Sequence, residues 1–427
     1  MMKLKKSQYN YFVRHNDKFI IYNMKSGSIG TMDNDVYDRF ITNSLTEDEI
    51  ETCKRKGLLI DEDYDEKAVM EKDRAEGIHK KDGKNFRIWP TSACNARCYY
   101  CFEKGIKYEN MSEETAEHVV GFIASQIEEG DTFVVEWFGG EPLLKITTME
   151  FITERLQGIC RERNCHANYR MISNGSLIDE VMADRIKTNC FINYVQITLD
   201  GYGREYEIIK NYVNPQMYGF ERVISGIRRL KERGIHVGIR MNYDTKNFNT
   251  LCQLIDYLHK EFTEYEDIKY YVYPVWTSVL DNDDTFVSEA EADRQYLELL
   301  KRIYGHGMNS LRQLARLGYR KYQCHACHES GFSIYPDGSI GKCDEIFTQK
   351  IGDIKQGIID LETYNYWTKQ GVDEKCDKCV FLPMCQGGCR SSRFNNMPQC
   401  FAHRKILPDL LKWYVDAMAE KRRKLPV

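Results

Sequence analysis

The sequence predicts an α/β protein whose core is a parallel sheet of six βα units, a partial (β/α)6 barrel. From Phe86 onward, short β-rich runs alternate with amphipathic stretches of roughly 10–20 residues that have helical periodicity. Glycines and polar residues that are unusual for strands stand at the carboxyl ends of these runs, where parallel α/β folds carry their sites. The six runs are residues 86–90, 132–140, 167–175, 194–201, 236–244 and 269–276.

Composition and charge indicate a globular protein and exclude several classes. The 427 residues are 42% hydrophobic and 29% charged, which favours two or three folded domains. The formal net charge of −4 makes no electrostatic case for nucleic acid binding. No apolar run approaches the ~18–20 residues that a bilayer span requires, and the N-terminus lacks the apolar core of a secretory signal. We therefore expect a cytoplasmic protein with no nucleic acid or membrane partner.

Residues 1–80 are expected to form a small unit of their own. The run 18–33 predicts two short strands around a turn at Lys25-Ser26-Gly27, and a helical pattern follows. The sequence Thr46-Glu47-Asp48-Glu49 has the form of a capping box and marks the start of a second helix. Residues 57–60 predict another short strand, and the highly charged stretch after them suits a linker or an exposed helix.

The chain after the sheet is expected to divide into two further parts. A helical bridge over 281–323, capped by Ser288 with Glu291, follows the sheet domain at 86–280. Residues 324–427 then form a turn-rich, cysteine-dense domain that ends in an amphipathic helix over 403–424.

Sixteen cysteines in a long intracellular chain indicate metal binding, because cytosolic thiols stay reduced. Five scattered ones are interpreted as small hydrophobic residues: Cys53, Cys160, Cys165, Cys190 and Cys252. Eleven are clustered and are the predicted metal ligands: Cys94, Cys98, Cys101, Cys324, Cys327, Cys343, Cys376, Cys379, Cys385, Cys389 and Cys400.

The first cluster, Cys94, Cys98 and Cys101, has the spacing C-x3-C-x2-C in the loop after the first run. A closed structural zinc site needs four ligands, so a zinc site here would require a distant His or Cys. A four-iron cluster held by three thiolates leaves one iron without a protein ligand, and that iron is open to a substrate or cofactor. The spacing favours this second interpretation.

The stretch "CNARCYYC" resembles the C-x3-C-x-aromatic-C motif of the radical S-adenosylmethionine (SAM) enzymes, with Tyr100 at the aromatic position. The resemblance implies that the open iron of a 4Fe–4S cluster chelates the amino and carboxylate groups of SAM. It also implies that an electron from the cluster cleaves SAM to a 5′-deoxyadenosyl radical, which abstracts hydrogen from a substrate. An external donor such as flavodoxin or ferredoxin is expected to supply the electron.

Further motifs at the strand ends strengthen the resemblance. "FGGEP" (138–142) is similar to the family's Gly-Gly-Glu-Pro, and "ISNG" (172–175) to its Thr-Asn-Gly. A guanidinium pairs bidentately with a carboxylate, so an arginine on the fifth run is a candidate for the SAM carboxylate, with a surface salt bridge as the alternative. After the fourth run this chain has "GYGREYEIIKNY" where many relatives have His-Asp-x-x-Arg, so the role of that loop is open. The implied cofactor-binding residues are Tyr100, Gly139, Gly140, Glu141, Ser173, Asn174 and Arg240.

The C-terminal cysteines resemble the seven-cysteine SPASM domain, whose core pattern C-x2-C-x5-C-x3-C matches residues 376–389. The resemblance implies two auxiliary 4Fe–4S clusters, and a pair of zinc ribbons is the alternative. One cluster would be held by Cys376, Cys379, Cys385 and Cys400. The other would use Cys343 and Cys389 with Cys324, Cys327 or both, which leaves open whether it has a free iron.

Radical SAM enzymes with a SPASM domain mostly modify peptides or proteins. The unit at 1–80 resembles the winged-helix-like element that binds leader peptides of ribosomally made natural products, where a leader adds a strand to a sheet edge. A structural N-terminal extension is the alternative. The leading hypothesis is a peptide maturase that forms a thioether between a peptide cysteine and a carbon. A carbon–carbon bond or an epimer is also possible, and the auxiliary clusters would accept an electron or bind the substrate thiolate.

Two other functions are kept in view. An anaerobic sulfatase-maturating enzyme, which oxidises a Cys or Ser to formylglycine, shares the SPASM pattern. Asp344 directly follows Cys343. The resemblance to those enzymes implies a catalytic acidic base at this position. A structural residue of a turn is an alternative of equal weight. A non-catalytic iron–sulfur or zinc scaffold would bind metal without cleaving SAM.

Overall fold

The computed structural model describes residues 3–80, 83–244, 246–275, 289–309, 318–369, 371–394, 400 and 404–423. The chain divides into two compact units, each described by itself. The larger is formed by His79–Asn309 and His325–Lys369, and the smaller by Met1–Ile78, Ser310–Cys324 and Gln370–Val427. The predicted helix cap at Ser288 and residues 281–288 and 310–317 of the predicted bridge lie outside the described residues.

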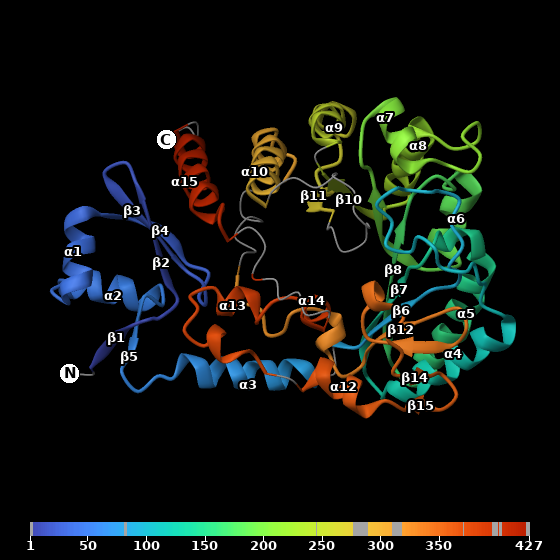
Figure 1. Cartoon of the computed structure of the whole chain (residues 1–427), viewed down its shortest axis with the longest axis horizontal. Coiled ribbons are helices and arrows are strands. Elements are labelled where there is room, and N and C mark those ends of the chain that lie inside the picture. The colour runs from blue at the N-terminus through green and yellow to red at the C-terminus, as the bar shows by residue number, and fades with distance from the viewer. Residues whose placement is uncertain are drawn as a thin grey trace. The chain divides into compact units, whose positions relative to one another are not determined.

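The six predicted strands are all present in the larger unit. They are parallel to one another and adjacent in the sheet in their order along the chain (Figure 1). The α/β class with a mainly parallel sheet is therefore confirmed. The strands are β6 (Asn85–Ile88), β7 (Thr132–Trp137), β8 (His166–Ser173), β9 (Ile192–Thr198), β10 (His236–Tyr243) and β11 (Lys269–Pro274).

The sheet continues past β6 into a part of the chain for which no strand was predicted. β12 (Gly331–Ile334) pairs parallel with β6, in the register Gly331 to Asn85. Three short antiparallel strands follow: β13 (Ser339–Gly341), β14 (Gly352–Asp353) and β15 (Gly357–Ile358). The predicted cysteine-dense segment therefore contributes its first part to the sheet of the larger unit.

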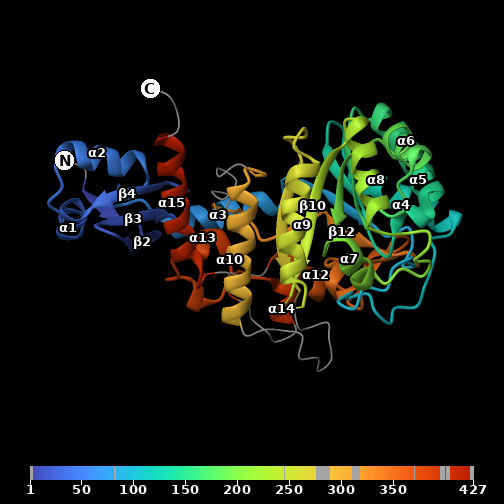
Figure 2. The ribbon, with the colours of Figure 1, turned by 90° about the horizontal axis from the view of Figure 1, so that it is seen from above.

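Helices connect the parallel strands and cover the sheet. Alternate strand residues are buried, as in β7, where Phe133, Val135 and Trp137 have no exposed surface. This burial of apolar surface fixes which side of each strand faces inward. Figure 2 shows α8 and α9 running beside β10, which both of them contact. The helices between the strands are α4 (Glu113–Gln126), α5 (Ile146–Glu162), α6 (Glu180–Thr188), α7 (Gly203–Lys210), α8 (Phe220–Glu232) and α9 (Phe248–Glu261).

Two more helices belong to the larger unit. α10 (Glu289–Gly305) packs against β11 and α9, which confirms a helix in the described part of the predicted bridge. α12 (Leu361–Thr368) has Asp360 as its N-cap, and the Asp360 side chain accepts a hydrogen bond from the backbone N–H of Thr363.

The smaller unit has a three-stranded antiparallel sheet of β2 (Asn10–His15), β3 (Lys18–Asn23) and β4 (Ile29–Asp33). The last two strands flank the predicted turn, whereas β1 (Leu4–Lys6), which pairs with β5 (Leu59–Asp61), and β2 were not predicted. A small apolar core containing Ile21, Phe40 and Leu58 joins the sheet to its helices. These helices are α1 (Asn34–Thr42), α2 (Glu47–Arg55) and α3 (Glu66–Ile78).

The predicted capping box at the start of α2 is confirmed. The backbone N–H of Glu49 donates to the Thr46 hydroxyl at 3.4 Å, and the backbone N–H of Thr46 donates to the Glu49 carboxylate at 2.9 Å. The remaining helices of this unit are α13 (Leu382–Cys385), α14 (Arg390–Phe394) and α15 (Leu407–Arg423), the last of which is the predicted terminal helix.

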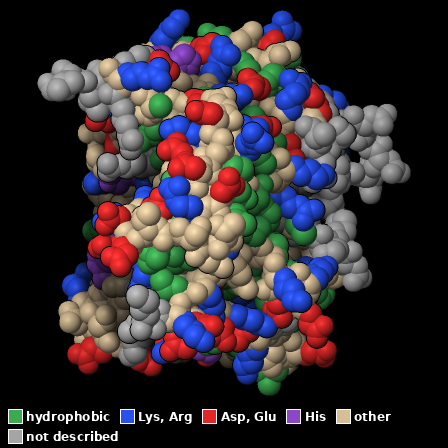
Figure 3. Space-filling model, turned by 90° about the vertical axis from the view of Figure 1, so that its left-hand side faces the viewer, with side chains coloured by type: hydrophobic (Ala, Val, Ile, Leu, Met, Phe, Trp, Pro, Cys, Tyr) green, Lys and Arg blue, Asp and Glu red, His purple; other side chains and the backbone are tan. Residues whose placement is uncertain are grey.

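Two features of the structure relate to the nucleic acid and membrane partners that the sequence does not predict. On the face shown in Figure 3, basic and acidic side chains are interspersed, so that face has no broad region of a single sign. Among the described helices, none combines the length and the apolar character needed to cross a bilayer.

Candidate active site

The loop that carries Cys94, Cys98 and Cys101 follows β6, and the three side chains are half-buried. Backbone hydrogen bonds attach this loop to later parts of the larger unit. The N–H of Glu141, after β7, donates to the carbonyl of Ala93 at 2.8 Å, and the N–H of Arg97 donates to the carbonyl of Lys210, at the end of α7, at 2.9 Å. The cysteines are therefore held at the carboxyl end of the parallel strands, as the sequence predicts.

The chemistry of these thiols fits an iron–sulfur cluster. Burial raises the pKa of Cys94 and of Cys101 to about 12, so an uncompensated thiolate is costly here and a bound cationic centre would balance it. Burial also raises the pKa of Cys98, against the opposing charge of Lys210. No three His, Cys, Asp or Glu side chains in the described ranges are placed to hold one metal ion together. A cubane differs from such a site because each of its irons takes only one thiolate.

The glycines of the "FGGEP" turn allow close contact with the cysteine loop. Gly139 has φ of 76°, a conformation that favours glycine. A Cβ on Gly140 would lie 2.1 Å from the carbonyl oxygen of Ala93, which is impossible without movement of that backbone. The N–H of Gly140 donates to the carboxylate of Glu103 at 2.8 Å, which adds another tie between the turn and the loop.

Glu141 has no exposed surface, and its carboxylate binds groups of the chain itself. It accepts hydrogen bonds from the Ser173 hydroxyl at 2.8 Å, the Asn174 N–H at 2.8 Å and the Leu143 N–H at 3.2 Å. Burial raises the pKa of Glu141 to about 7, although these hydrogen bonds favour the ionised form. The carboxylate thus fixes the ends of β7 and β8 relative to each other.

Asn174 extends this connection to the cysteines. Its side-chain amide donates to Asn95 at 2.8 Å and lies 3.9 Å from the Cys94 sulfur. Its carbonyl oxygen accepts from the Ser176 hydroxyl at 2.6 Å. The structure therefore brings Glu141, Ser173 and Asn174 together beside the first cysteine.

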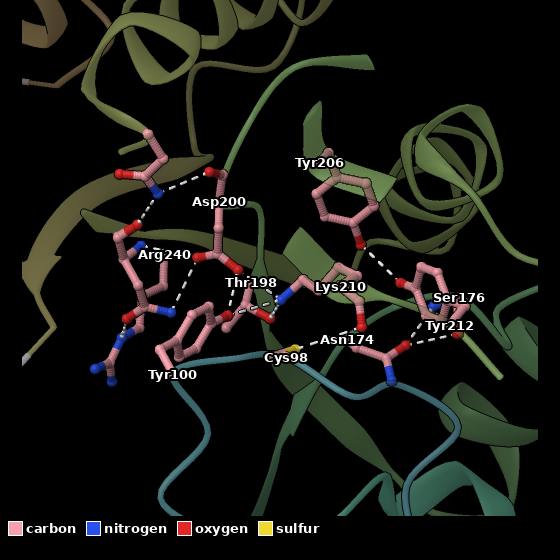
Figure 4. A network of polar contacts seen from close by, with 12 residues as sticks. Cys98, Tyr100, Asn174, Ser176, Thr198, Asp200, Tyr206, Lys210, Tyr212 and Arg240 are labelled. Carbon is pink, nitrogen blue, oxygen red and sulfur yellow. Dashed lines mark hydrogen bonds and ion pairs between the residues drawn. The ribbon is translucent and has the colours of Figure 1, made fainter. Parts of the chain in front are cut away.

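Tyr100 belongs to a second buried network, drawn in Figure 4. Its hydroxyl donates a short hydrogen bond to Asp200, which follows β9, and accepts one from the Lys210 ammonium at 3.2 Å. Asp200 and Lys210 form an ion pair at 2.6 Å. Burial lowers the pKa of Lys210, but the charge of Asp200 outweighs this and the pKa is raised, so the lysine stays charged.

Arg240 lies at the border of the same network. Its Nε donates to Asn242 at 2.9 Å, and the Asn242 side chain donates to Asp200 at 3.0 Å. The central carbon of the Arg240 guanidinium lies over the ring of Tyr273, 4.2 Å from the ring centroid. The SAM contact predicted for Arg240 remains a prediction.

Asp200 and Lys210 were not among the predicted site residues. Lys210 lies in the loop whose role the sequence leaves open, and a lysine at a helix end commonly points to solvent. The available signal was the fourth predicted run, 194–201, because Asp200 lies at its carboxyl end.

Asp344 is 4% exposed and lies in a polar cluster beside β6 and β12. Its carboxylate pairs with Arg87 through a short contact and accepts hydrogen bonds from the Ser333 hydroxyl at 2.7 Å and the Trp89 ring N–H at 3.2 Å. Burial raises the pKa of Asp344, but the charge of Arg87 outweighs it and the pKa is lowered. Asp344 is therefore an ionised acceptor with several partners.

The other predicted metal ligands are divided between the two units. Cys327 and Cys343 belong to the larger unit, and the others to the smaller unit. In the smaller unit, residues 376–385 form tight turns. The N–H of Cys379 donates to the carbonyl of Cys376 at 3.0 Å, and the N–H of Cys385 donates to the carbonyl of Phe381 at 2.9 Å. The ligand sets of the auxiliary clusters remain predictions.

Comparison with known proteins agrees with this geometry. Residues 88–258 match the radical SAM superfamily. Fe-coproporphyrin III synthase of Methanosarcina barkeri is 28% identical over 224 residues, which are 52% of this chain and about half, 51%, of that relative. The cysteine-type anaerobic sulfatase-maturating enzyme of Clostridium perfringens is 23% identical over 337 residues, 71% of this chain and 87% of the relative.

Solved structures share the fold. The structure titled native anSMEcpe with bound AdoMet has a TM-score of 0.60 at 19% identity and covers 79% of this chain and 98% of its own. Streptococcus suis SuiB bound to precursor peptide SuiA has a TM-score of 0.53 at 14% identity and covers 94% and 99%. Fold, cysteine loop and superfamily match together define a radical SAM domain. The chain is an enzyme that contains a radical SAM domain, matched over residues 88–258, and such a domain implies a SAM-binding 4Fe–4S cluster.

A Gly140→Ala variant tests the packing of the turn against the cysteine loop. We expect its Cβ to displace Ala93, so that the reconstituted protein binds about 4 fewer iron atoms per chain, one cubane, and cleaves SAM at least tenfold more slowly. Iron and sulfide analysis and chromatography of 5′-deoxyadenosine measure both. Gly158→Ala, where a Cβ meets nothing within 4 Å, is the matched control, and equal iron content in the two variants would contradict the prediction.

The pH dependence of stability tests the buried Glu141. A folded-state pKa of about 7, above the unfolded value near 4.5, means that the folded chain binds this proton more tightly. Its contribution is then complete below pH 4.5 and is lost as pH rises through 7, by up to about 3 kcal/mol. Urea unfolding of the metal-free chain should show wild type losing more stability than Glu141→Gln between pH 5 and pH 8. Parallel pH profiles of the two proteins would refute this assignment.

Proposed function

We propose that this enzyme is a radical SAM peptide maturase that joins a cysteine of a precursor peptide to a carbon through a thioether. The observation that carries the proposal is the cysteine loop, tied by hydrogen bonds to the turn after β7, to Asn174 after β8 and to the end of α7. This arrangement leaves three thiols of one loop at the carboxyl end of the strands. The radical SAM domain indicates the class of enzyme, and the proposal adds a peptide substrate and a thioether product.

The chain's own residues would prepare the site in definite ways. When bound, the cluster and SAM supply the electron and the 5′-deoxyadenosyl radical that removes a hydrogen atom from the substrate. Cys94, Cys98 and Cys101 would hold the cluster, and the Gly139-Gly140 backbone allows a close approach beside them. Arg240 would pair with the SAM carboxylate. Glu141, whose carboxylate is already hydrogen-bonded within the chain, would act by keeping Ser173 and Asn174 in place.

A peptide substrate is supported by the comparisons. One solved relative is titled native anSMEcpe with bound AdoMet and Cp18Cys peptide, and another is SuiB bound to precursor peptide SuiA. The SuiB match covers 94% of this chain, so the likeness of fold includes the N-terminal part. A leader would add a strand to an edge of the β2–β3–β4 sheet, where edge strands present unpaired backbone groups.

The two auxiliary 4Fe–4S clusters and the external electron donor belong to the same proposal. The eight C-terminal cysteines would hold the clusters, in the sets that the SPASM resemblance implies. Thioether formation removes two hydrogens from the peptide. One would leave as a hydrogen atom in 5′-deoxyadenosine. The other would leave as a proton and an electron, and the auxiliary clusters would accept the electron.

Incubation of the reconstituted enzyme with SAM, a reductant and a co-encoded cysteine-containing peptide tests this function. We expect a product two hydrogens lighter than the peptide and a tandem mass spectrum that locates the bridge at a cysteine. A peptide with that cysteine replaced by alanine is the control and should keep its mass. Formation of 5′-deoxyadenosine without any two-hydrogen loss would refute the thioether assignment.

A formylglycine-forming activity is the second candidate, because the sulfatase-maturating relative aligns over 87% of its length and Asp344 follows Cys343. The surroundings of Asp344 favour a different role. A general base works best with a pKa near the working pH, whereas the pKa of Asp344 is lowered and its oxygens are engaged by Arg87, Ser333 and Trp89. We propose that Asp344 orients Arg87.

The substitution Asp344→Asn separates the two roles. It keeps the acceptor for Trp89 and Ser333 but cannot take a proton at neutral pH. The amide nitrogen of the variant would face Arg87, but Arg87 keeps its hydrogen bond to Glu136 at 2.7 Å. We therefore expect product formation to fall by about tenfold or less, with SAM cleavage retained. Loss of product by more than 100-fold with intact SAM cleavage would identify a base and favour the formylglycine-forming activity.

A further inference from the structure

Lys210 is an unusually placed lysine at the end of α7. Only 1% of the residue is exposed, and lysine is almost never so buried without a charged partner. Its ammonium has three protons, and three acceptors lie in reach: Asp200 at 2.6 Å, the Thr198 hydroxyl at 2.8 Å and the Tyr100 hydroxyl at 3.2 Å. The lysine therefore carries a fixed positive charge at the carboxyl end of β9 (Figure 4).

Both ends of this residue contact the cysteine loop. Its backbone carbonyl accepts a hydrogen bond from the N–H of Arg97 at 2.9 Å and lies 3.9 Å from the sulfur of Cys98. Its side chain reaches Tyr100, two residues further along the loop. One residue thus holds the middle of the loop, between the first and third predicted ligands, at two separate points.

We propose that Lys210 is a positioning residue for the cluster. It fastens Cys98 and Tyr100 to the end of β9, and its buried ammonium, which offsets the negative charge of Asp200 near this loop, makes the bound cluster easier to reduce. The inference rests on the proposed function only in that the loop holds a cluster, and no peptide is needed to test it.

The simpler interpretation of Lys210 is an ion pair that stabilises the barrel. The two interpretations differ in what they change. A stabilising pair affects unfolding, whereas a charge next to the cluster affects the reduction potential, because a charge acts more strongly in a buried site of low dielectric than in water. The reduction potential is therefore the measurement that separates them.

The chain offers a matched control at the opposite end of the sheet. Lys84 and Asp131 form a buried ion pair of the same length, 2.6 Å, and the Lys84 ammonium also donates to the carbonyl of Gln126 at 2.7 Å. Lys84 precedes β6 and Asp131 precedes β7, so this pair lies at the amino ends of the strands. Lys84→Met should cost stability as Lys210→Met does, without changing the surroundings of the cysteine loop.

The experiment compares the full-length wild type, Lys210→Met, Lys210→Arg and Lys84→Met after anaerobic reconstitution with iron and sulfide. A potentiometric titration follows the electron paramagnetic resonance signal that changes when SAM is added. We expect Lys210→Met to shift the reduction equilibrium at least tenfold toward the oxidised cluster, about 60 mV for a one-electron couple. Lys210→Arg, which keeps the charge, and Lys84→Met should stay within twofold of wild type. Equal potentials for Lys210→Met and Lys84→Met would overturn the proposal.

If the Lys210→Met variant takes up no cluster, the Tyr100→Phe variant tests the proposal instead. It removes the hydroxyl that links the loop to Lys210 and Asp200 and keeps both charges. We expect its cluster to lose iron to a chelator at least fivefold faster than that of Tyr108→Phe, a control tyrosine that is 54% exposed. Iron loss at the rate of this control would overturn the proposal. A wild-type chain that takes up no cluster would overturn the proposed function together with this inference.

Discussion

One buried carboxylate connects the candidate site at the carboxyl ends of the parallel strands. Glu141 has no exposed surface and accepts hydrogen bonds from Ser173, Asn174 and Leu143, which come from two successive strand ends. An ionised carboxylate accepts hydrogen bonds and cannot donate them, so each group that it contacts must be a hydrogen-bond donor. Without it, three donors would be buried and unsatisfied, and Asn174 would lose the contact that places its amide near Cys94.

Much of the parallel sheet could be predicted from the sequence because each strand is both apolar and followed by a distinctive turn. β7 is an example: its buried alternation precedes Gly139 and Gly140, and the observed strand lies inside the predicted run. β12 to β15 could not be predicted in this way, since strands of two to four residues show no periodicity. They exist because β12 pairs with β6, a partner far away in the sequence.

The residues of the candidate site that lie in recognisable motifs could be predicted from the sequence. Those whose position depends on tertiary contacts could not. Glu141, Ser173 and Asn174 were selected by a resemblance to strand-end motifs, and Tyr100 by the cysteine motif. The structure brings the first three together beside Cys94, and their contact with SAM remains a prediction. Lys210 could not be found by this route, because its segment departs from the family pattern and its burial depends on Asp200 and Thr198 meeting it in space. Asp344 was selected by its neighbour Cys343, whereas its pairing with Arg87 depends on the β12–β6 contact that the sequence does not display.

The pairing of β12 with β6 also has a consequence for the order of folding. β6 is the first of the parallel strands to leave the ribosome, and β7 can join it early, but its other edge has no partner until residues 331–334 have been made. Contacts between such distant segments form slowly because a long loop must close first. During that interval the free edge of β6 is a site for mispairing with other strands. The segment that positions Asp344 is thus also the one that pairs with the second edge of β6 and covers it.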